Sequence, residues 1–276
     1  MKRPLVTTLH TILDNPESEG GIILKRLIEK SAAVVVMMET IKEKLIKEYH
    51  APAGKIIIIP HGTPDLPLGS TDVNKKKRRL SGRLTLGNIN LLTQTKGVEY
   101  SLKATSLIAK EFPEVLYLVI GQTHPVDRYY NGEKYRKSLV KLVKKLKIQK
   151  NVKFVNEYLS LNELIDWIGT IDFYITPYLD PQQSASGALA YAVGAGKCCI
   201  SSPYIYAKEV LANGRGVLVP FRDSKGIASA VIKLWKDKDK KMEMERKTYD
   251  YGRLMTWSNV GLRYLDLFNT ITFSKK

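Results

Sequence analysis

Residues 171–202, IDFYITPYLDPQQSASGALAYAVGAGKCCISS, decide the fold of this chain. The apolar segments Phe173–Thr176 and Cys198–Ser201 each have the length and composition of a strand buried in a parallel sheet. Between them lie a polar loop and a short helix, which we expect to begin near Ser186 and Gly187 and to stop at two glycines. Strand, loop, helix and strand in this order predict an α/β fold.

The turn Ser184–Gly187 is a candidate anion site. Ligands of open parallel sheets bind beyond the carboxyl ends of the strands. A helix that begins there offers unpaired N–H groups and a positive partial charge. Because Gly187 has no side chain, a phosphate could approach the amides of the first turn closely. The alternative is an ordinary serine-capped helix that Gly194 and Gly196 terminate.

The rest of the chain alternates between apolar runs and amphipathic segments, which extends the α/β prediction to the whole protein. The expected strands are Pro4–Ile12, Ala33–Met38, Lys55–Ile59, Arg83–Asn90, Val115–Ile120, Val152–Val155 and Gly216–Val219. The expected helices are Glu19–Lys30, Ile41–Tyr49, Gly97–Glu111, Glu133–Lys147, Leu161–Gly169, Tyr206–Ala212, Lys225–Lys236 and Trp257–Phe268.

Residues 63–82 differ from both halves of the chain. They are rich in proline, glycine and serine, and they contain the basic run 75–79, KKKRR. This composition predicts a linker between two α/β units. We expect the basic run to be solvated, although it could also contact phosphates or lipid headgroups.

Composition is that of a globular protein. The chain has 276 residues, of which 44% are hydrophobic and 26% charged, and no apolar run approaches the roughly 18 residues of a membrane span. Cys198 and Cys199 are adjacent, so their side chains point to opposite faces of a strand and predict neither a disulfide framework nor a metal site. We therefore expect a cytoplasmic protein.

The formal net charge of +17 is compatible with an anionic ligand, an anionic membrane surface or nucleic acid. The lysines are spread over the predicted helices, and no basic stripe alternates with stacking aromatic residues. Specific nucleic-acid binding is therefore not expected. A location peripheral to an anionic membrane stays open.

Nine phrases, in order along the chain, resemble retaining glycosyltransferase family 4, the group 1 glycosyltransferases of GT-B fold. They are SAAVVVMMETIKEKLI, KIIIIPHGTPD, LLTQTKGVEYSLKA, YLVIGQTHP, GEKYRKSL, FYITPYLD, SGALAYAVGAGK, SSPYIYAKEVLANGRGVLVPF and YDYGRLMTWSNV. The resemblance implies two facing Rossmann-like domains, a nucleotide-diphosphate sugar bound mainly by the second, front-face transfer with retention, and no required metal or cofactor.

The resemblance also divides the chain. Residues 1–62 are expected to form a partial N-terminal Rossmann-like domain, 63–82 the linker, 83–255 a complete nucleotide-sugar-binding domain, and 256–276 a helix that crosses back. Members of the family begin with several strands and a glycine-rich loop, none of which precedes Pro4. A second chain or a homodimer could supply them.

Several residues occupy positions that bind donor or line the cleft in the resembled family. Lys96 is the expected phosphate cation, and the amides of Ser186 and Gly187 are expected on the other side of the diphosphate. His10 is expected to line the reaction cleft, and His124 to face the crevice. His61, in the hinge phrase, is assigned no chemistry.

Three departures leave a second reading open. Asn90 and Leu91 stand where many members have Gly-Arg, so one cation is missing. Gln183 and Tyr191 stand at two glutamate positions that contact the sugar and the ribose. A polar amide and a phenol can still hydrogen-bond these hydroxyls. The alternative is a degenerate module that binds nucleotide or a partner chain without transfer.

Overall fold

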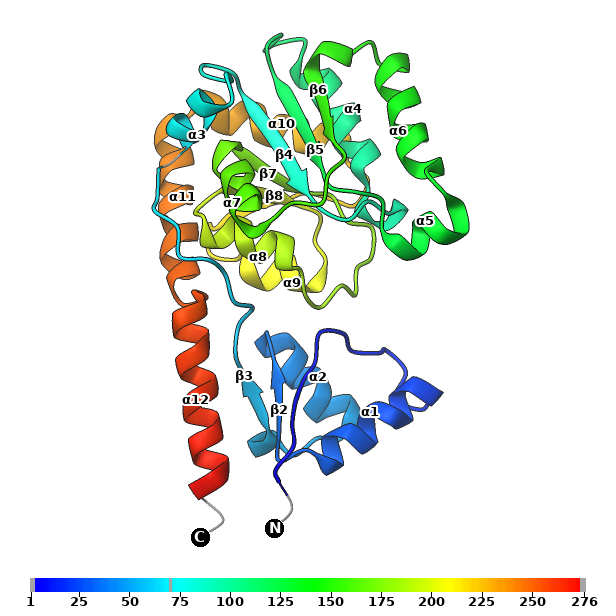
Figure 1. The fold of residues 1–276 in the computed structure, drawn as a ribbon, viewed down its shortest axis with the longest axis vertical. Helices are drawn as coiled ribbons and strands as arrows, with labels where there is room; N and C mark the ends of the chain where they lie inside the picture. The colour runs from blue at the N-terminus through cyan, green and yellow to red at the C-terminus, as the bar shows by residue number, and fades with distance from the viewer. Residues whose placement is uncertain (1–2, 70, 274–276) are drawn as a thin grey trace.

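The computed structural model describes residues 3–69 and 71–273 and shows two lobes (Figure 1). The smaller lobe holds a three-stranded sheet, and the larger lobe a six-stranded sheet. A polar segment near residues 59–69 joins them. The long last helix leaves the larger lobe and runs alongside the smaller one, so both chain ends lie near the same end of the molecule.

The small sheet is parallel, in the order β1-β2-β3. Val34 and Val36 pack with the helices α1 and α2, whereas Val35 packs with α12 on the other face. This alternation explains why the strand is apolar throughout. The elements of the lobe are β1 (Val6–Thr8), α1 (Glu19–Lys30), β2 (Ala33–Val36), α2 (Glu39–Tyr49) and β3 (Ile56–Ile58).

The large sheet is also parallel, in the order β6-β5-β4-β7-β8-β9, with helices on both faces. Cys198 and Cys199 enter the cores on opposite faces, as the sequence predicts. The strands are β4 (Thr85–Ile89), β5 (Leu116–Ile120), β6 (Val152–Val155), β7 (Phe173–Thr176), β8 (Cys198–Ser201) and β9 (Gly216–Leu218). The helices between them are α4 (Val98–Ile108), α5 (Pro125–Asn131), α6 (Lys134–Lys145), α7 (Leu161–Thr170), α8 (Gly187–Gly194) and α9 (Ile205–Val210), followed by α10 (Ser224–Lys236).

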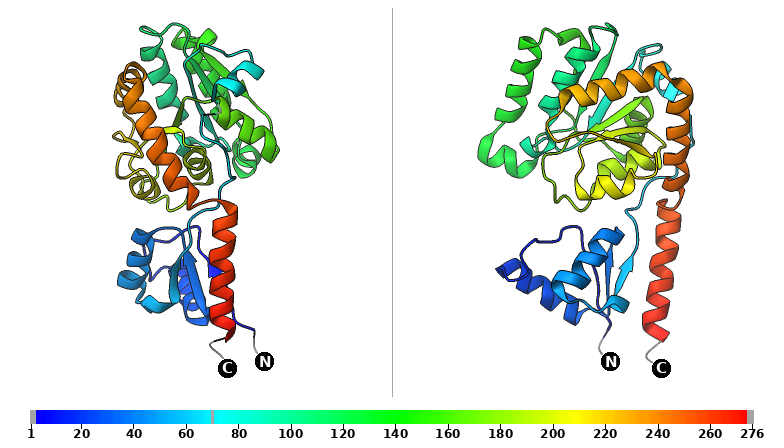
Figure 2. Two further views of the ribbon diagram at one scale, coloured as in Figure 1. Left: turned by 90° about the vertical axis from the view of Figure 1, so that its left-hand side faces the viewer. Right: turned by 180° about the vertical axis from the view of Figure 1, so that it is seen from behind.

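Two consecutive helices, α11 (Lys238–Arg253) and α12 (Trp257–Phe273), connect the lobes along one side (Figure 2). Thr63 forms a bridge with Thr256 at the crossing, and a side chain on Gly62 would collide with the Trp257 ring. The close approach of the two segments therefore requires a glycine.

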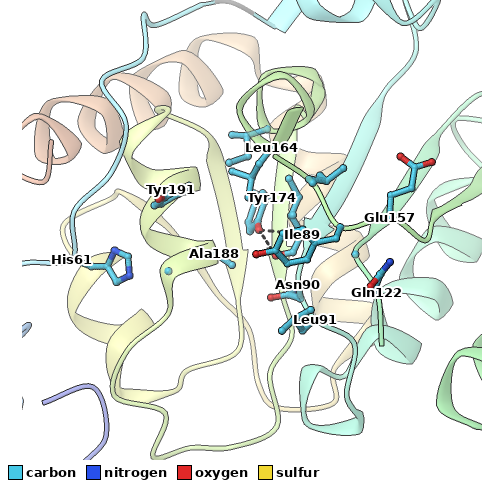
Figure 3. A pocket seen from close by; sticks show the side chains of 15 residues that line it. His61, Ile89, Asn90, Leu91, Gln122, Glu157, Leu164, Tyr174, Ala188 and Tyr191 are labelled. Carbon is cyan, nitrogen blue, oxygen red and sulfur yellow. Dashed lines mark hydrogen bonds between the residues drawn. The ribbon is translucent and has the colours of Figure 1, made fainter. Parts of the chain in front are cut away.

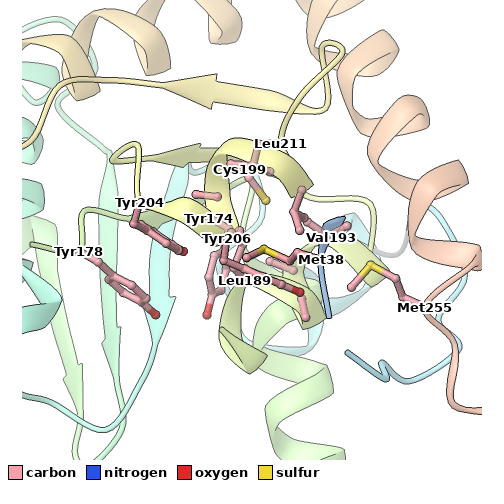
Figure 4. Packing of buried hydrophobic residues seen from close by; sticks show 14 of the residues in the cluster. Met38, Tyr174, Tyr178, Leu189, Val193, Cys199, Tyr204, Tyr206, Leu211 and Met255 are labelled. Carbon is pink, nitrogen blue, oxygen red and sulfur yellow. The ribbon is translucent and has the colours of Figure 1, made fainter. Parts of the chain in front are cut away.

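The lobes also share a core. Met38, at the start of α2, is buried beside Leu189 and Val193 of α8 in the cluster of Figure 4. Nearby, the carboxylate of Glu209 on α9 accepts hydrogen bonds from the backbone N–H groups of Glu39 and Thr40. Since Met38 provides no side-chain cap, the larger lobe caps a helix of the smaller one.

One expectation about the basic run is wrong. Part of it lies in the helix α3 (Thr71–Lys77), and Lys75 is only 3% exposed. Its ammonium lies 2.5 Å from Asp172 Oδ2 and donates to the carbonyl of Arg83 at 2.8 Å. The buried carboxylate therefore holds one lysine of a run that was expected to be solvated throughout.

The prediction of an α/β fold with parallel sheets is confirmed. Helices α5 and α11 were not predicted, because neither has a regular apolar stripe. Within the residues that the structure describes, no helix is both long enough and apolar enough to cross a membrane.

Candidate functional site

A cavity of about 350 Å³ lies where β4, β5 and β6 end, between these strand ends and the helices α7 and α8 (Figure 3). Its walls are largely apolar and include a smaller number of polar side chains. This is the edge of a parallel sheet at which ligands bind. The cavity is lined by His61, Ile89, Asn90, Leu91, Gly121, Gln122, Glu157, Tyr158, Leu159, Leu164, Ile168, Tyr174, Gly187, Ala188 and Tyr191.

Helix α8 begins at the edge of this cavity. The Ser186 hydroxyl accepts a hydrogen bond from the Leu189 amide at 3.2 Å, which caps the helix. Gly187 follows and lines the cavity. Tyr191, one turn further on, also lines the cavity and leaves it open. Figure 3 shows Tyr191 and Ala188 on the side of α8 that borders the cavity. The start of α8 thus has the serine cap of the alternative interpretation, and Gly187 beside it lines the cavity.

His61 faces the first turn of α8. Its Nε2 lies 3.1 Å from the position that a Cβ on Gly187 would occupy. Its Nδ1 lies 2.8 Å from the Gly62 carbonyl, which can only accept, so we place the proton on Nδ1 and leave Nε2 as an acceptor. Burial lowers the pKa of His61, with a further decrease from His10. The sequence assigned His61 no chemistry, yet it lines the cavity.

Tyr178 connects Lys96 with the start of α8. The Lys96 ammonium lies 4.0 Å from the centre of the Tyr178 ring. The phenol donates to Asn90 Oδ1 at 2.5 Å, and burial raises its pKa to about 12 although hydrogen bonds with Ser186 and Asn90 oppose this. Burial also lowers the pKa of Lys96, which the nearby Asp180 partly offsets. Lys96 and Ser186 therefore meet the same side chain.

Asn90 carries an unused donor. Its Oδ1 accepts from Tyr178, but its buried Nδ2 has no hydrogen-bond partner within the described part of the chain. A buried amide without a partner costs about 1–3 kcal/mol, and a ligand in the cavity that Asn90 lines could satisfy it. This is the position at which the resembled family often has a Gly-Arg pair.

The other predicted site residues, His10, Lys96, His124, Gln183, Ser184 and Ser186, do not line this cavity. The Ser184 hydroxyl donates to the His10 carbonyl at 3.2 Å, which ties the small lobe to the loop before α8. Gln183 Nε2 donates to the Ala185 carbonyl at 3.0 Å. His124 caps α5 and lines a different cavity with Thr93 to Thr95. Of the predicted residues, Gly187 and Tyr191 line the main cavity.

Sequence reasoning missed four polar residues of this cavity: His61, Asn90, Gln122 and Glu157. Each follows closely after the end of a strand, β3, β4, β5 or β6. For Asn90, Gln122 and Glu157 that position is a usable signal, since the carboxyl ends of parallel strands in one sheet meet at one edge, whereas His61 follows a strand of the other sheet. Among the described residues, no three or more His, Cys, Asp and Glu side chains are grouped so as to hold a metal ion.

Comparison with known proteins agrees with this architecture. The sequence profile of the family Glycosyl transferases group 1 matches residues 70–253. No curated protein matches the chain. Similar solved structures include Anabaena HepE, with 17% identity, a TM-score of 0.79, and coverage of 98% of this chain and 72% of that one.

A glycosyltransferase from Rickettsia africae has 16% identity and a TM-score of 0.78 over 97% of this chain and 70% of its own. The sucrose-phosphate synthase of Thermosynechococcus elongatus has 16% identity and a TM-score of 0.79 over 98% of this chain and 68% of its own.

Two parallel-sheet lobes, with a cavity at the carboxyl edge of the larger sheet, define a GT-B protein. The chain belongs to group 1 of the glycosyl transferases, because that family matches well over half of its length. The predictions of the fold and of the enzyme family are thereby confirmed.

Proposed function

We propose that this protein transfers a sugar, with retention, from a nucleotide-diphosphate sugar to an acceptor. One observation carries the proposal: Lys96 and the capped start of α8 both adjoin Tyr178, beside an open cavity at the carboxyl edge of the sheet. A cation and a helix start that adjoin the same ring offer the two kinds of group that bind a diphosphate.

The cavity suits a nucleoside. Ile89, Leu164 and Ile168 offer apolar contacts for a base, while Tyr191 and Asn90 offer hydrogen-bonding groups. In this arrangement the diphosphate lies between Lys96 and the first amides of α8. Similar structures support the donor class, since Anabaena HepE was solved with UDP and glucose, with UDP, and with UDP-glucose.

In the transfer step, the acceptor hydroxyl oxygen forms a bond to the anomeric carbon while the bond from that carbon to the diphosphate oxygen breaks. The acceptor proton passes to the departing diphosphate, on which negative charge grows. Preoriented donors stabilise such charge because they need no reorganisation during the reaction. Lys96 and the Gly187 amide supply these donors. Gln183 is proposed to bind the sugar hydroxyls and Tyr191 the ribose, with His10 lining the cleft where the acceptor enters. His124, which adjoins the loop of Lys96, is proposed to contact donor or acceptor at its outer side.

The second candidate is a module that binds nucleotide without transfer. The neutral Gln183 and Tyr191 favour it, since both stand where charged residues are expected from the resemblance. The two candidates differ in turnover and not in binding.

A panel of nucleotide sugars and nucleoside diphosphates tests both candidates. Transferase function predicts an increase in unfolding temperature with one nucleoside diphosphate and hydrolysis or transfer of the matching sugar, which a His10→Ala variant reduces. Nucleotide binding without turnover, unaffected by His10→Ala, supports the binding module. The absence of any nucleotide effect would contradict both.

An additional strand beside β1 is also proposed, supplied by a partner chain or a second copy. β1 is the outermost strand, and the backbones of Leu5 and Leu9 bond toward β2. The N–H and C=O groups of Val6 therefore face the open edge, which natural sheets usually cover. If a second copy covers it, Val6→Pro converts a dimer to a monomer in sedimentation, whereas Gly54→Ala does not.

Contact with an anionic membrane is proposed for α5 and α6. Tyr129 and Tyr130 on α5 are 82% and 75% exposed, next to the basic face of α6. Vesicles of phosphatidylglycerol should sediment the protein and vesicles of phosphatidylcholine should not. The double variant Tyr129→Ser with Tyr130→Ser should bind phosphatidylglycerol vesicles more weakly. Equal binding to both lipids would contradict the membrane proposal.

A further inference from the structure

A second cavity, of about 570 Å³, lies at the opposite edge of the six-stranded sheet, where strands begin. Asp172 and Lys197 stand directly before β7 and β8, and both line it. The remaining wall comes from α3, from the turn after α8 and from α11. This basic cavity shares no residue with the cavity of Figure 3.

Lys197 is the buried cation of the basic cavity. It is 4% exposed, and its ammonium donates to Thr71 Oγ1 at 2.7 Å and to the Gly169 carbonyl at 3.2 Å. Both acceptors are neutral, and in the part of the chain that the structure describes no carboxylate lies within 4.0 Å of this ammonium. An ammonium has three hydrogens, so one donor is left over from the contacts with described residues. A buried charge that no carboxylate contacts directly is unfavourable, although Asp172 and Glu245 attract it from further away.

Two further cations stand on α11. Lys238 and Arg246 are exposed and line the cavity, and they lie on one face of the helix because they are eight residues apart. Neither makes an ion pair within 4.0 Å among the described residues. They differ in this from Lys75 and Lys241, whose charges Asp172 and Glu245 balance.

The cavity also has an apolar side. Trp235, Met242 and Leu68 line it, and the Trp235 ring lies 5.9 Å from the Lys75 ammonium. Asp72 is the one acid of the lining without an ion pair among the described residues. The unbalanced charges are therefore three cations and one carboxylate, beside a surface that suits the organic part of a ligand.

We propose that the basic cavity binds the phosphate groups of a phosphorylated small molecule, held by Lys197, Lys238 and Arg246. Lys197 provides the desolvated contact, since a charge-assisted hydrogen bond is strongest away from water. Lys238 and Arg246 provide the outer contacts, and Trp235 lies next to the rest of the ligand. The proposal does not depend on the transferase activity.

Calorimetric titration of the full chain with pyrophosphate tests the proposal. We would use a Lys96→Met background, so that binding at the donor crevice does not obscure the result. In that background Lys238→Glu with Arg246→Glu should weaken pyrophosphate binding at least about tenfold, because two attractive charges become repulsive. These positions are exposed, so the variant is expected to fold. Lys197→Met should abolish binding.

The matched control is Lys141→Glu with Lys145→Glu on α6, which makes the same change in net charge at exposed positions outside the cavity. It should change the affinity by less than about twofold at 0.15 M salt, where distant surface charges are screened. Equal weakening by both double variants, or no binding before mutation, would overturn the proposal, because the attraction would then be only that of a basic surface.

Discussion

The two edges of the large sheet carry their charges differently. At the carboxyl edge, the cavity of Figure 3 is lined by neutral polar groups, aromatic rings and one carboxylate, Glu157. The Lys96 ammonium lies over the Tyr178 ring nearby. At the amino edge, the basic cavity contains a buried ion pair and a buried lysine, Lys197. The helix α8 reaches from one to the other, since Gly187 lines the first cavity and Ala195 the second.

This difference distinguishes a region open to a ligand from a region held together by its own contacts. At the carboxyl edge, the buried Asn90 Nδ2 has no hydrogen-bond partner among the described residues, and a ligand in the cavity could accept from it. The amino edge is fixed by contacts among its own residues, and only part of its positive charge is balanced. Variants at each edge should therefore affect different measurements, activity at one and stability at the other.

The largest effect on stability is expected for Asp172→Asn. Its Oδ2 accepts from the Lys75 ammonium at 2.5 Å and from the Thr85 amide at 2.7 Å. Removing one charge of a buried pair leaves the other uncompensated, so we expect a loss of about 3–5 kcal/mol in denaturant unfolding. Lys75→Met with Asp172→Leu should recover much of it. If Asp172→Asn leaves the unfolding free energy unchanged, the Lys75 ammonium must be hydrated when the carboxylate is absent.

Lys96→Met should act on catalysis and not on folding. Removing one preorganised donor to a developing anion lowers turnover about 100- to 1,000-fold. Lys103→Met on α4, an exposed lysine nearby in sequence, should leave it within about twofold. Steady-state kinetics with the active donor measure both. Full activity without Lys96 would exclude it from the donor site.

Much of this comparison could be predicted from sequence, but only at the carboxyl edge. Ser186 and Gly187 lie in a local pattern, a capped helix after a buried strand, whereas Lys96 was assigned from the family resemblance. His61 and Asn90 required tertiary structure, because their role depends on which strand ends become neighbours. Strand order is a long-range property that one strand's residues do not contain.

The amino edge was not predictable for a different reason. Lys75 lies in a basic run, and such runs are usually solvated. Its burial depends on Asp172, 97 positions later. Lys197 follows two glycines and precedes a strand, a position that carries no sign of burial. Helix α11, which walls the basic cavity, was missed because its buried positions, Met244, Thr248 and Gly252, are few and only weakly apolar.

Lys197 gives the amino edge a measurable pH dependence. Burial lowers its pKa to about 8, with Lys241 and Lys75 lowering it further and Asp172 and Glu245 opposing them. Between pH 8 and the unfolded value near 10.5, the unfolded chain binds more protons, so stability rises with pH in this window. The shift corresponds to about 3 kcal/mol.

The measurement is the difference in unfolding free energy between the protein and Lys197→Met, taken from pH 7 to 10.5 at constant salt. Titration of other groups cancels in this difference. The unfolding free energy of the natural protein should increase relative to that of Lys197→Met as the pH rises above 8. A difference that stays constant would mean that Lys197 is solvated and that the basic cavity lacks its inner cation.

The smallest expected effect is at the carboxyl edge, for Gly187→Ala. The added methyl group would lie 3.1 Å from His61 Nε2 and 3.4 Å from Cε1, so the ring must move by a few tenths of an ångström. We expect about a five- to tenfold loss of nucleotide affinity, roughly 1 kcal/mol, with little change in unfolding. Gly54→Ala is the control, since no atom lies within 4 Å of its Cβ position.

In a His61→Ala background the crowding of the added methyl group is relieved, so Gly187→Ala should lower the nucleotide affinity less there. If Gly187→Ala lowers nucleotide affinity equally in both backgrounds, the methyl group acts by blocking the approach of the phosphate to the helix amides. If it lowers the affinity in neither background, Gly187 is not part of the donor site.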